Sequence, residues 1–194
     1  IQDVTGKPPQ GFAAPGWAWS EKLWDVLISK QYRYDTSVFP SWLMIPQYGF
    51  WIMNYLGNSK ITRFLRRGRD VGRSVVANKY PFIYESDKGR LKVLPLPVAS
   101  FRIAFWHSLG FVIGWDNHFR MLKSCLASNM PFYYLMHAGD LISPLDLKDN
   151  SYTRRMPRSG VSIEKKMEMF ERVLDILEEN GRQITTMKAL SDQV

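Results

Sequence analysis

A strand–helix–strand pattern occurs at both ends of the chain and constrains its fold more than any other feature. Near the start, the apolar residues 11–14 precede a helix, and residues 32–39 then alternate like a strand that stops at Pro40. Near the end, the almost continuous apolar segment 131–142, PFYYLMHAGDLI, precedes a long helix and a short strand at 183–187. Strands joined by a helix pair in parallel, and a continuous apolar strand is typically buried on both faces. We therefore predict an α/β fold with parallel strands.

Helix signals support this pattern. Ser20 is a predicted N-cap, and the apolar stripe of the first helix consists of Leu23, Trp24, Leu27 and Ile28. A second helix begins near Asn117 and ends before residue 129. Ser162 caps the last helix, Gly181 ends it, and its predicted stripe is Ile163, Met167, Phe170, Leu174 and Leu177.

The middle of the chain is harder to assign. Residues 41–56 carry no charge and are broken by Pro46 and Gly49, which argues against one continuous helix. Residues 59–80 are predicted to be helical and basic. Residues 91–100 resemble a strand, but Pro95 and Pro97 place it at an edge or at a strand mouth. We treat residues 41–90 as an insertion or lid within one domain that spans residues 1–194, since 194 residues suit a single domain.

Composition restricts the partners and the compartment. The net charge is +8, and residues 60–73 contribute Lys60, Arg63, Arg66, Arg67, Arg69 and Arg73 against Asp70 alone. This basic segment is compatible with binding to nucleic acid, with binding to an anionic membrane surface, or with having no special partner. Cys125 is the one cysteine, so an internal disulfide is impossible. With no apolar segment near the roughly 20 residues of a membrane span and no signal peptide, we expect a cytoplasmic protein that can associate with a membrane.

Candidate chemistry falls where the predicted parallel strands end. In parallel α/β folds the active site lies beyond the carboxyl ends of the strands. The segment Pro15–Gly16–Trp17 follows the first strand, Asp35 lies in the second, and His137 lies near the end of the apolar segment. A lone histidine can equally be a buried core residue, and Asp35 can equally be a turn-forming carboxylate. We expect Asp35 and His137 to face one shared hollow.

Three segments resemble the polysaccharide deacetylase family, also called the chitooligosaccharide deacetylase homology domain. Residues 11–40, GFAAPGWAWSEKLWDVLISKQYRYDTSVFP, are similar to its Gly-Phe-Arg-x-Pro-Gly motif, the helix that follows, and its Tyr-Asp-Ser-Ser-Val-Phe-Pro segment. Residues 133–141, YYLMHAGDL, resemble the closing Leu-x-His motif. Residues 163–192 resemble the family's final helix and strand. The resemblance spans most of the chain and is weakest over residues 41–90.

The resemblance implies a fold and an activity. The fold would be the carboxy-terminal part of a deformed seven-stranded (β/α) barrel, with the amino-terminal strands absent from this chain. The activity would be metal-dependent removal of an N-acetyl group from an amino sugar or polysaccharide in glycan metabolism, by a hydrolase that acts on carbon–nitrogen bonds other than peptide bonds. His137 would protonate the departing amine and Asp35 would support it. Pro15, Trp17, Tyr34 and Leu135 would bind the substrate.

The chain departs from the family pattern at two points. The family's early motifs, which carry the base and the metal ligands, do not occur, so the divalent metal, zinc in most members, would be bound by residues not present in this chain. His107, His118 and His137 show no metal-ligand spacing, so no residue here is assigned to a metal. At the position where the family usually has an arginine, this chain has Ala13. A missing amino-terminal segment or a second subunit would cover the open sheet edges.

Two other functions remain open from the sequence alone. One is a non-catalytic carbohydrate-binding relative that keeps the aromatic wall, and the other is a basic interaction module for an anionic surface. Of the possible partners, we expect a carbohydrate and do not expect nucleic acid. The sequence does not identify the sugar, or whether the acyl group is acetyl or formyl.

Overall fold

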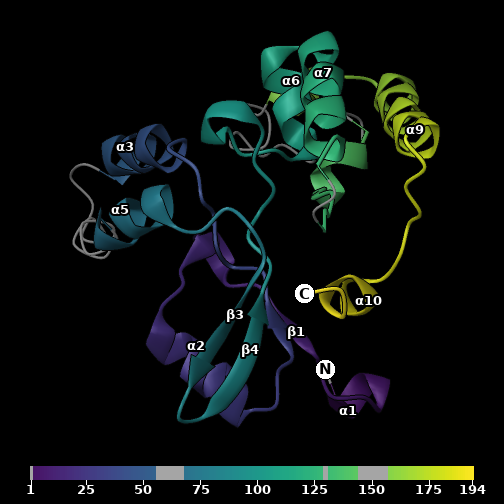
Figure 1. Ribbon diagram of the computed structural model, residues 1–194. Helices are drawn as coiled ribbons and strands as arrows, with labels where there is room; N and C mark the ends of the chain where they lie inside the picture. Colours follow the sequence, from purple (N-terminus) through teal and green to yellow (C-terminus); the bar gives the residue numbers. More distant parts are fainter. Residues whose placement is uncertain (1, 56–67, 129–130, 144–156) are drawn as a thin grey trace. The chain divides into compact units, whose positions relative to one another are not determined.

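The computed structural model describes residues 2–55, 68–128, 131–143 and 157–194 of the chain (Figure 1). They form two compact units, one made of Ile1–Ala104 with Thr185–Val194 and the other of Phe105–Ile184, and each is described by itself. The prediction of a single domain over 1–194, with a lid at 41–90, stays a prediction. No helix in the described parts of the chain is long and apolar enough to cross a bilayer.

A four-stranded, mostly parallel sheet forms the centre of the first unit, which is therefore mixed α/β as predicted. The strands are β1 (Gly11–Phe12), β2 (Tyr34–Asp35), β3 (Phe82–Ser86) and β4 (Gly89–Val93). Their order in the sheet is β1-β2-β4-β3; β1, β2 and β4 run parallel, and β3 pairs antiparallel to β4. A closed barrel is not among the described elements.

Helix α2 (Glu21–Ser29) connects β1 to β2 and packs against β4 (Figure 1). The side chain of Ser20 accepts a hydrogen bond from the Leu23 N–H at 3.2 Å, so the predicted N-cap is confirmed. The buried members of the core between helix and sheet are Trp24, Leu27, Val38, Ala77, Leu91 and Val93. Burial of these apolar side chains is the main stabilising contribution within this unit.

The strands differ from the predicted ones in length. The segment 32–39 forms a strand only at β2, and the segment 91–100 is a strand only up to Val93. Pro95 and Pro97 lie beyond its end, where the missing N–H groups break no ladder hydrogen bond. The β3–β4 hairpin was not predicted, because its two-residue turn at 87–88 carries Asp-Lys rather than one of the Gly-containing pairs that mark a tight hairpin in sequence.

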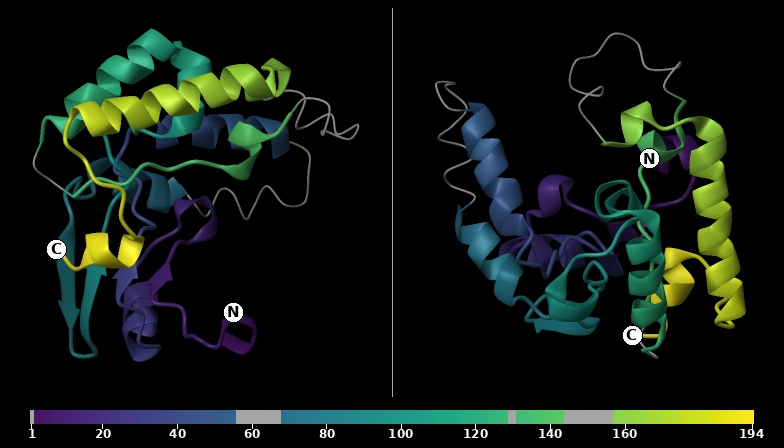
Figure 2. Two further views of the ribbon diagram at one scale, coloured as in Figure 1. Left: turned by 90° about the vertical axis from the view of Figure 1, so that its right-hand side faces the viewer. Right: turned by 90° about the horizontal axis from the view of Figure 1, so that it is seen from above.

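The remaining helices of the first unit are α1 (Gln2–Thr5), α3 (Met44–Tyr55), α5 (Gly68–Val76) and α10 (Met187–Ser191). Helices α3 and α5 lie side by side (Figure 2). The predicted break in the first of them was wrong, because Pro46 falls in the first helical turn, where its missing N–H would have no partner anyway. Of the basic helix predicted at 59–80, residues 56–67 lie outside the described residues.

The second unit is helical. Its longer elements are α6 (Gly110–Ile113), α7 (Trp115–Leu126) and α9 (Ile163–Glu179), and α7 packs against α9. The side chain of Ser162 caps α9, and Gly181 follows its end in the left-handed conformation, both as predicted. The buried core consists of Phe105, Leu122, Leu126, Val173 and Ile176.

Three predictions for the part of the chain after residue 130 were wrong. The apolar segment 131–142 forms no strand, and the 3-10 turn η4 (Ala138–Leu141) lies near its end. Its aromatic side chains pack against the helices instead of against neighbouring strands. Residues 183–186 have no strand either, and α10 begins directly after them. The buried face of α9 holds Lys166, Met169, Val173 and Ile176, so it is rotated from the predicted stripe.

A close contact at Gly11 yields a testable prediction. A Cβ atom at this position would overlap the Tyr34 ring on the neighbouring strand. We expect Gly11→Ala to lower the free energy of unfolding by about 1–3 kcal/mol, because the ring or the strand must move. Gly72→Ala is the matched control, since nothing lies within 4 Å of its added Cβ. This control should be neutral or slightly stabilising in the same urea titration, and equal losses in the two variants would contradict the contact.

Candidate functional site

The carboxyl edge of the parallel strands carries the first group of predicted site residues. Phe12, Asp35 and Val93 end β1, β2 and β4 and are paired in register, so the loops that follow them emerge at one edge of the sheet. The loop after β1 contains the 3-10 turn η1 (Pro15–Trp17). This edge is where ligands bind in open parallel sheets.

Pro15 and Trp17 lie differently in this turn. Pro15 is exposed, whereas the half-buried Trp17 ring packs 5.2 Å, centroid to centroid, from the buried ring of Phe39. Gly16 and Trp17 both have positive φ angles, of 65° and 60°. A left-handed conformation is uncommon for tryptophan, and such conformations persist when the surrounding structure fixes them. The turn therefore presents a defined proline–aromatic surface.

Asp35 is completely buried and makes a compact set of hydrogen bonds. Its Oδ2 accepts from the Trp24 indole N–H at 3.0 Å and from the Ser37 backbone N–H at 3.1 Å. The Ser37 hydroxyl donates to Oδ1 at 2.5 Å and accepts from the Ala14 N–H at 2.8 Å. Asp35 thus ties helix α2 and the loop after β1 to the end of β2. Burial raises the pKa of this carboxyl group.

These hydrogen bonds show how Asp35 is paired although position 13 is an alanine. The resemblance places an arginine at this position as a partner for the carboxylate, whereas Ala13 is exposed. The indole of Trp24 and the hydroxyl of Ser37 supply neutral donors to Asp35 instead. Asp35 has no solvent-exposed surface, and its hydrogen bonds support a structural role, in which it holds helix α2 and the loop after β1 at the end of β2.

Substitutions at Asp35 test this role. Asp35→Ala leaves the Trp24 N–H buried without its acceptor, and we expect it to lower the free energy of unfolding by about 2 kcal/mol. Because burial raises the folded-state pKa, the wild type loses stability as pH rises through that value. Asp35→Asn cannot ionise and lacks this loss, so its stability at about pH 7 relative to that at about pH 4 should be higher than in the wild type. Urea titrations at both pH values measure this, and parallel pH profiles for wild type and Asp35→Asn would refute the assignment.

The second group of predicted site residues, Leu135 and His137, lies in the second unit. Leu135 is half-buried, and its carbonyl accepts from the His107 N–H at 2.9 Å. His137 directly precedes η4, and its side chain is 53% exposed. The buried carboxylate of Asp140 accepts the His137 backbone N–H at 2.8 Å, and His137 Nδ1 lies 3.9 Å from the same oxygen, Oδ2. An exposed imidazole is thus held on a turn that a buried carboxylate fixes.

Asp140 is fixed in turn by two further side chains. Its Oδ1 accepts from the Ser108 hydroxyl at 2.7 Å and from Arg158 Nη1 at 3.1 Å. Arg158 Nη1 also donates to Ser108 Oγ at 3.0 Å. The almost fully buried Lys166 donates from Nζ to the Ile142 carbonyl at 2.6 Å, just after η4. Burial, together with the positive charge of Arg158, lowers the pKa of Lys166.

His107 and His118 form a separate buried cluster with Tyr134. The Tyr134 hydroxyl lies 2.8 Å from His107 Nδ1 and 2.8 Å from His118 Nε2, so it donates to one imidazole and accepts from the other. The remaining ring nitrogens, His107 Nε2 and His118 Nδ1, have no hydrogen-bond partner among the described residues. Burial lowers the pKa of both histidines, that of His118 to about 4, helped by His107. Both rings are therefore neutral near pH 7 and act in packing.

The structure divides the predicted site residues between its units. Tyr34 and Asp35 lie together with the Pro15–Trp17 turn in the first unit, and Leu135 and His137 lie in the second. The shared hollow for Asp35 and His137 stays a prediction. Sequence reasoning missed Asp140, its partners Ser108 and Arg158, and the buried Lys166, which bonds to the Ile142 carbonyl. The spacing His137-x-x-Asp140 could have predicted the contact between these two residues, because a carboxylate three residues after the cap position can accept the backbone N–H of the cap residue.

The described residues were also tested for a metal site. They contain no group of three or more histidine, cysteine, aspartate or glutamate side chains placed to bind a metal ion. The divalent metal that the resemblance implies, with its ligands on residues not present in this chain, therefore stays a prediction. Burial raises the pKa of Cys125 to about 11, so this thiol is protonated at neutral pH and a poor nucleophile.

We compared the chain with protein-family models, with curated proteins and with solved structures, and none of the three comparisons found a match.

Proposed function

We propose that the chain is part of a hydrolase that removes an N-acyl group from an amino sugar or polysaccharide. The observation that carries this proposal is His137: an exposed imidazole on a turn that the buried Asp140 fixes. It lies in the segment that resembles the closing motif of polysaccharide deacetylases, and the Pro15–Trp17 turn lies in the segment that resembles their aromatic wall.

The proposed role of His137 is to protonate the amine that leaves when the amide bond breaks. Nδ1 faces Asp140, so Nε2, on the other side of the ring, is the nitrogen available to a substrate. A positioned imidazole can donate a proton near neutral pH, and such general acids typically contribute a factor of about 10² to 10⁴ in rate. Asp140 acts as a positioning residue, because it holds the backbone of His137 and faces its ring.

The proposed substrate surface of the first unit consists of Pro15, Trp17 and Tyr34, and Leu135 of the second unit stays a predicted substrate residue. The exposed Pro15 and the half-buried rings of Trp17 and Tyr34 suit the apolar faces of sugar rings, and the positive φ angles of Gly16 and Trp17 point to a turn of defined shape. We further propose that the chain is the carboxy-terminal portion of a deacetylase-type barrel. A divalent metal, bound by residues not present in this chain, would provide Lewis-acid activation of the amide.

Acetate release tests the proposed function. The chain, together with any residues that precede Ile1 in its natural protein, is incubated with N-acetylated amino-sugar oligomers and zinc. We expect acetate and free amine in equal amounts, and their loss after chelation. Sugar binding without acetate release, abolished by Trp17→Ala, would favour a non-catalytic carbohydrate-binding protein and contradict the hydrolase.

A further inference from the structure

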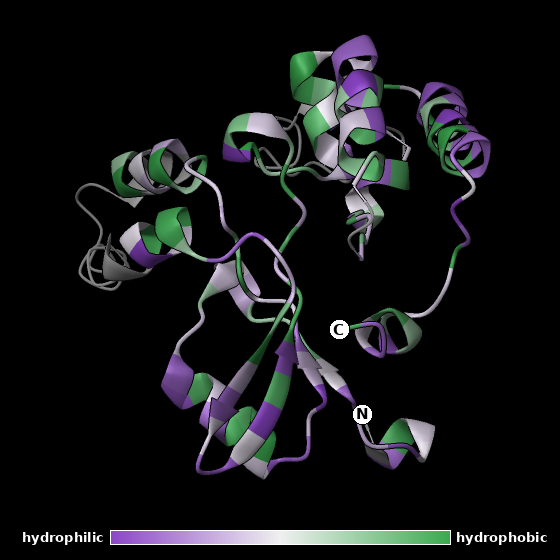
Figure 3. Ribbon diagram, viewed as in Figure 1, coloured by the Kyte–Doolittle hydropathy of each residue, from purple (hydrophilic) through white to green (hydrophobic). Residues whose placement is uncertain are grey.

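An exposed apolar surface lies on the first unit, where α3 and α5 pack together. Its members are Trp42, Ile45, Met53, Val76 and Phe101, of which Phe101 is 87% exposed and Val76 79% exposed. Ile45 and Met53 are eight residues apart and therefore share one face of α3. Figure 3 shows α3 in apolar and near-neutral colours. Side chains of this kind gathered on one surface indicate a binding partner.

The segment that carries Phe101 is held in a conformation that keeps the ring exposed. Phe101 and Arg102 both have φ angles of 57°, in the left-handed region. The Trp42 indole N–H donates to the Phe101 carbonyl at 2.9 Å, and Arg102 donates to the carbonyls of Pro40 and Ala77. These bonds join the start of α3, the end of α5 and the Phe101 segment. Strain of this kind is retained where surrounding contacts fix it, often at a functional surface.

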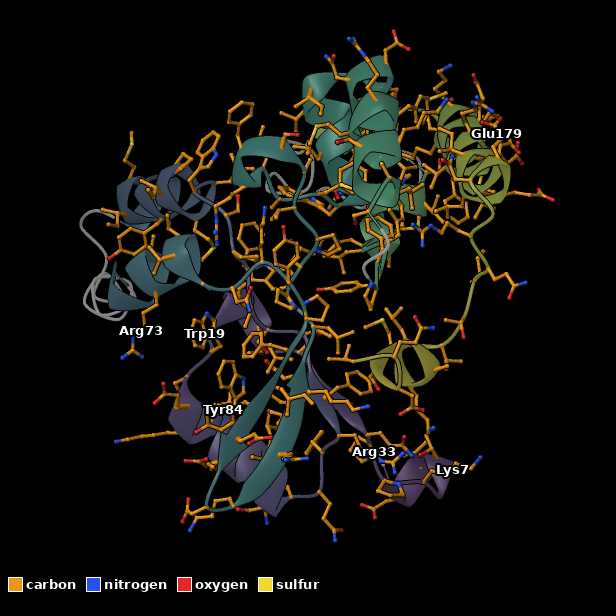
Figure 4. The ribbon with its side chains drawn as sticks, viewed as in Figure 1. Lys7, Trp19, Arg33, Arg73, Tyr84 and Glu179 are labelled. Carbon is orange, nitrogen blue, oxygen red and sulfur yellow. The ribbon has the colours of Figure 1, made fainter. Side chains whose placement is uncertain are left out.

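Positive charge is concentrated in the same part of the chain. Residues 36–84 contain seven lysine and arginine residues against one acidic residue, Asp70, and so carry six of the chain's eight net positive charges. Among the described side chains, Arg73 and Lys79 are exposed, and Figure 4 shows Arg73 pointing away from α5. Apolar side chains beside basic ones are typical of surfaces that bind anionic lipid bilayers.

We propose that this surface binds an anionic lipid bilayer, with Ile45, Met53 and Phe101 entering the interface and Arg73 and Lys79 contacting lipid headgroups. Trp42 suits the same boundary, because its indole has an apolar body and a polar N–H. Two copies joined symmetrically through this face would bring their positive charges together. A nucleic acid would neutralise the charge but would leave the apolar side chains largely exposed. The proposal is independent of the hydrolase activity.

Vesicle sedimentation tests the proposal. The chain is mixed with vesicles of phosphatidylcholine alone or of phosphatidylcholine with phosphatidylglycerol, and we expect strong binding only to the anionic vesicles. The triple variant Ile45→Gln, Met53→Gln, Phe101→Asn should bind at least roughly tenfold less tightly, since apolar burial in the interface is lost. Asparagine is chosen because it tolerates the left-handed conformation. Arg73→Gln and Lys79→Gln should each weaken binding roughly fivefold.

The control variant carries Val4→Gln and Ile184→Gln, which change exposed apolar side chains elsewhere on the chain. It should bind vesicles like the wild type, and thermal unfolding should show that both multiple variants are folded. Three results would overturn the proposal. These are no binding to anionic vesicles, unchanged binding by the triple variant, and a lipid-free dimer that only the triple variant fails to form. The last result would assign the surface to a contact between copies of this chain.

Discussion

Replacing Asp140 by alanine is expected to lower the free energy of unfolding by about 3 kcal/mol or more, the range found when one partner of a buried ion pair is removed. Asp140 is fully buried and accepts from the His137 N–H, the Ser108 hydroxyl and Arg158. Without the carboxylate, the half-buried guanidinium of Arg158 loses its countercharge. The turns that carry Ser108, His137 and Arg158 lose their common acceptor as well.

Urea titration gives the global effect, and hydrogen exchange of the amides in Phe105–Ile184 shows where protection is lost. Asp140→Asn keeps an acceptor for the His137 N–H but removes the charge, so it should lower the free energy of unfolding less than Asp140→Ala does. The exposed ion pair of Lys165 with Glu168 supplies a matched control, because Glu168→Ala should cost less than about 1 kcal/mol. Equal and small losses for Asp140→Ala and Glu168→Ala would contradict the role assigned to Asp140.

Acidification from about pH 7 to about pH 4 is expected to destabilise the second unit by about 3 kcal/mol through His118 alone. Burial and the neighbouring His107 lower the folded-state pKa of His118 from 6.5 to about 4. In that interval the unfolded chain binds a proton that the folded chain does not, so stability is lost as the pH falls. The lowered pKa of His107 acts in the same direction.

The pH dependence of the free energy of unfolding isolates the contribution of His118. His118→Gln removes the titrating group and keeps a side chain that can bond to the Tyr134 hydroxyl. Its free energy of unfolding should be lower at pH 7 but should fall less steeply towards pH 4. Hydrogen exchange of the α7 amides follows the second unit directly. A variant slope as steep as that of the wild type would show that His118 is not the residue responsible.

Local signals in the sequence predicted the elements that depend on local chemistry. Ser20 and Ser162 cap their helices as expected, and Gly181 adopts the left-handed conformation that ends α9. The parallel pairing of β1 with β2 also followed from the strand–helix–strand pattern. These features are specified within a few residues or by one connection, so a single sequence suffices to find them.

Features that depend on distant partners were not predictable in the same way. The apolar segment 131–142 has the composition of a buried strand, but its aromatic side chains pack against helices and η4 ends it. Asp35 was recognised as a candidate site residue, whereas its neutral hydrogen-bond donors Trp24 and Ser37 were not. The sequence does not indicate which acceptor an indole N–H bonds to, because that depends on the fold. Arg158 reaches Asp140 from eighteen residues along the chain, a separation that carries no periodic signal.

The most direct test of the proposed function is the rate of acetate release by His137→Gln. The His137 side chain is 53% exposed, so its replacement should leave the free energy of unfolding within about 0.5 kcal/mol of the wild type. Loss of the proposed general acid should nevertheless lower kcat at least about a hundredfold, with little change in KM. A His137→Gln protein that releases acetate at the wild-type rate would contradict the assignment of His137 as the proton donor.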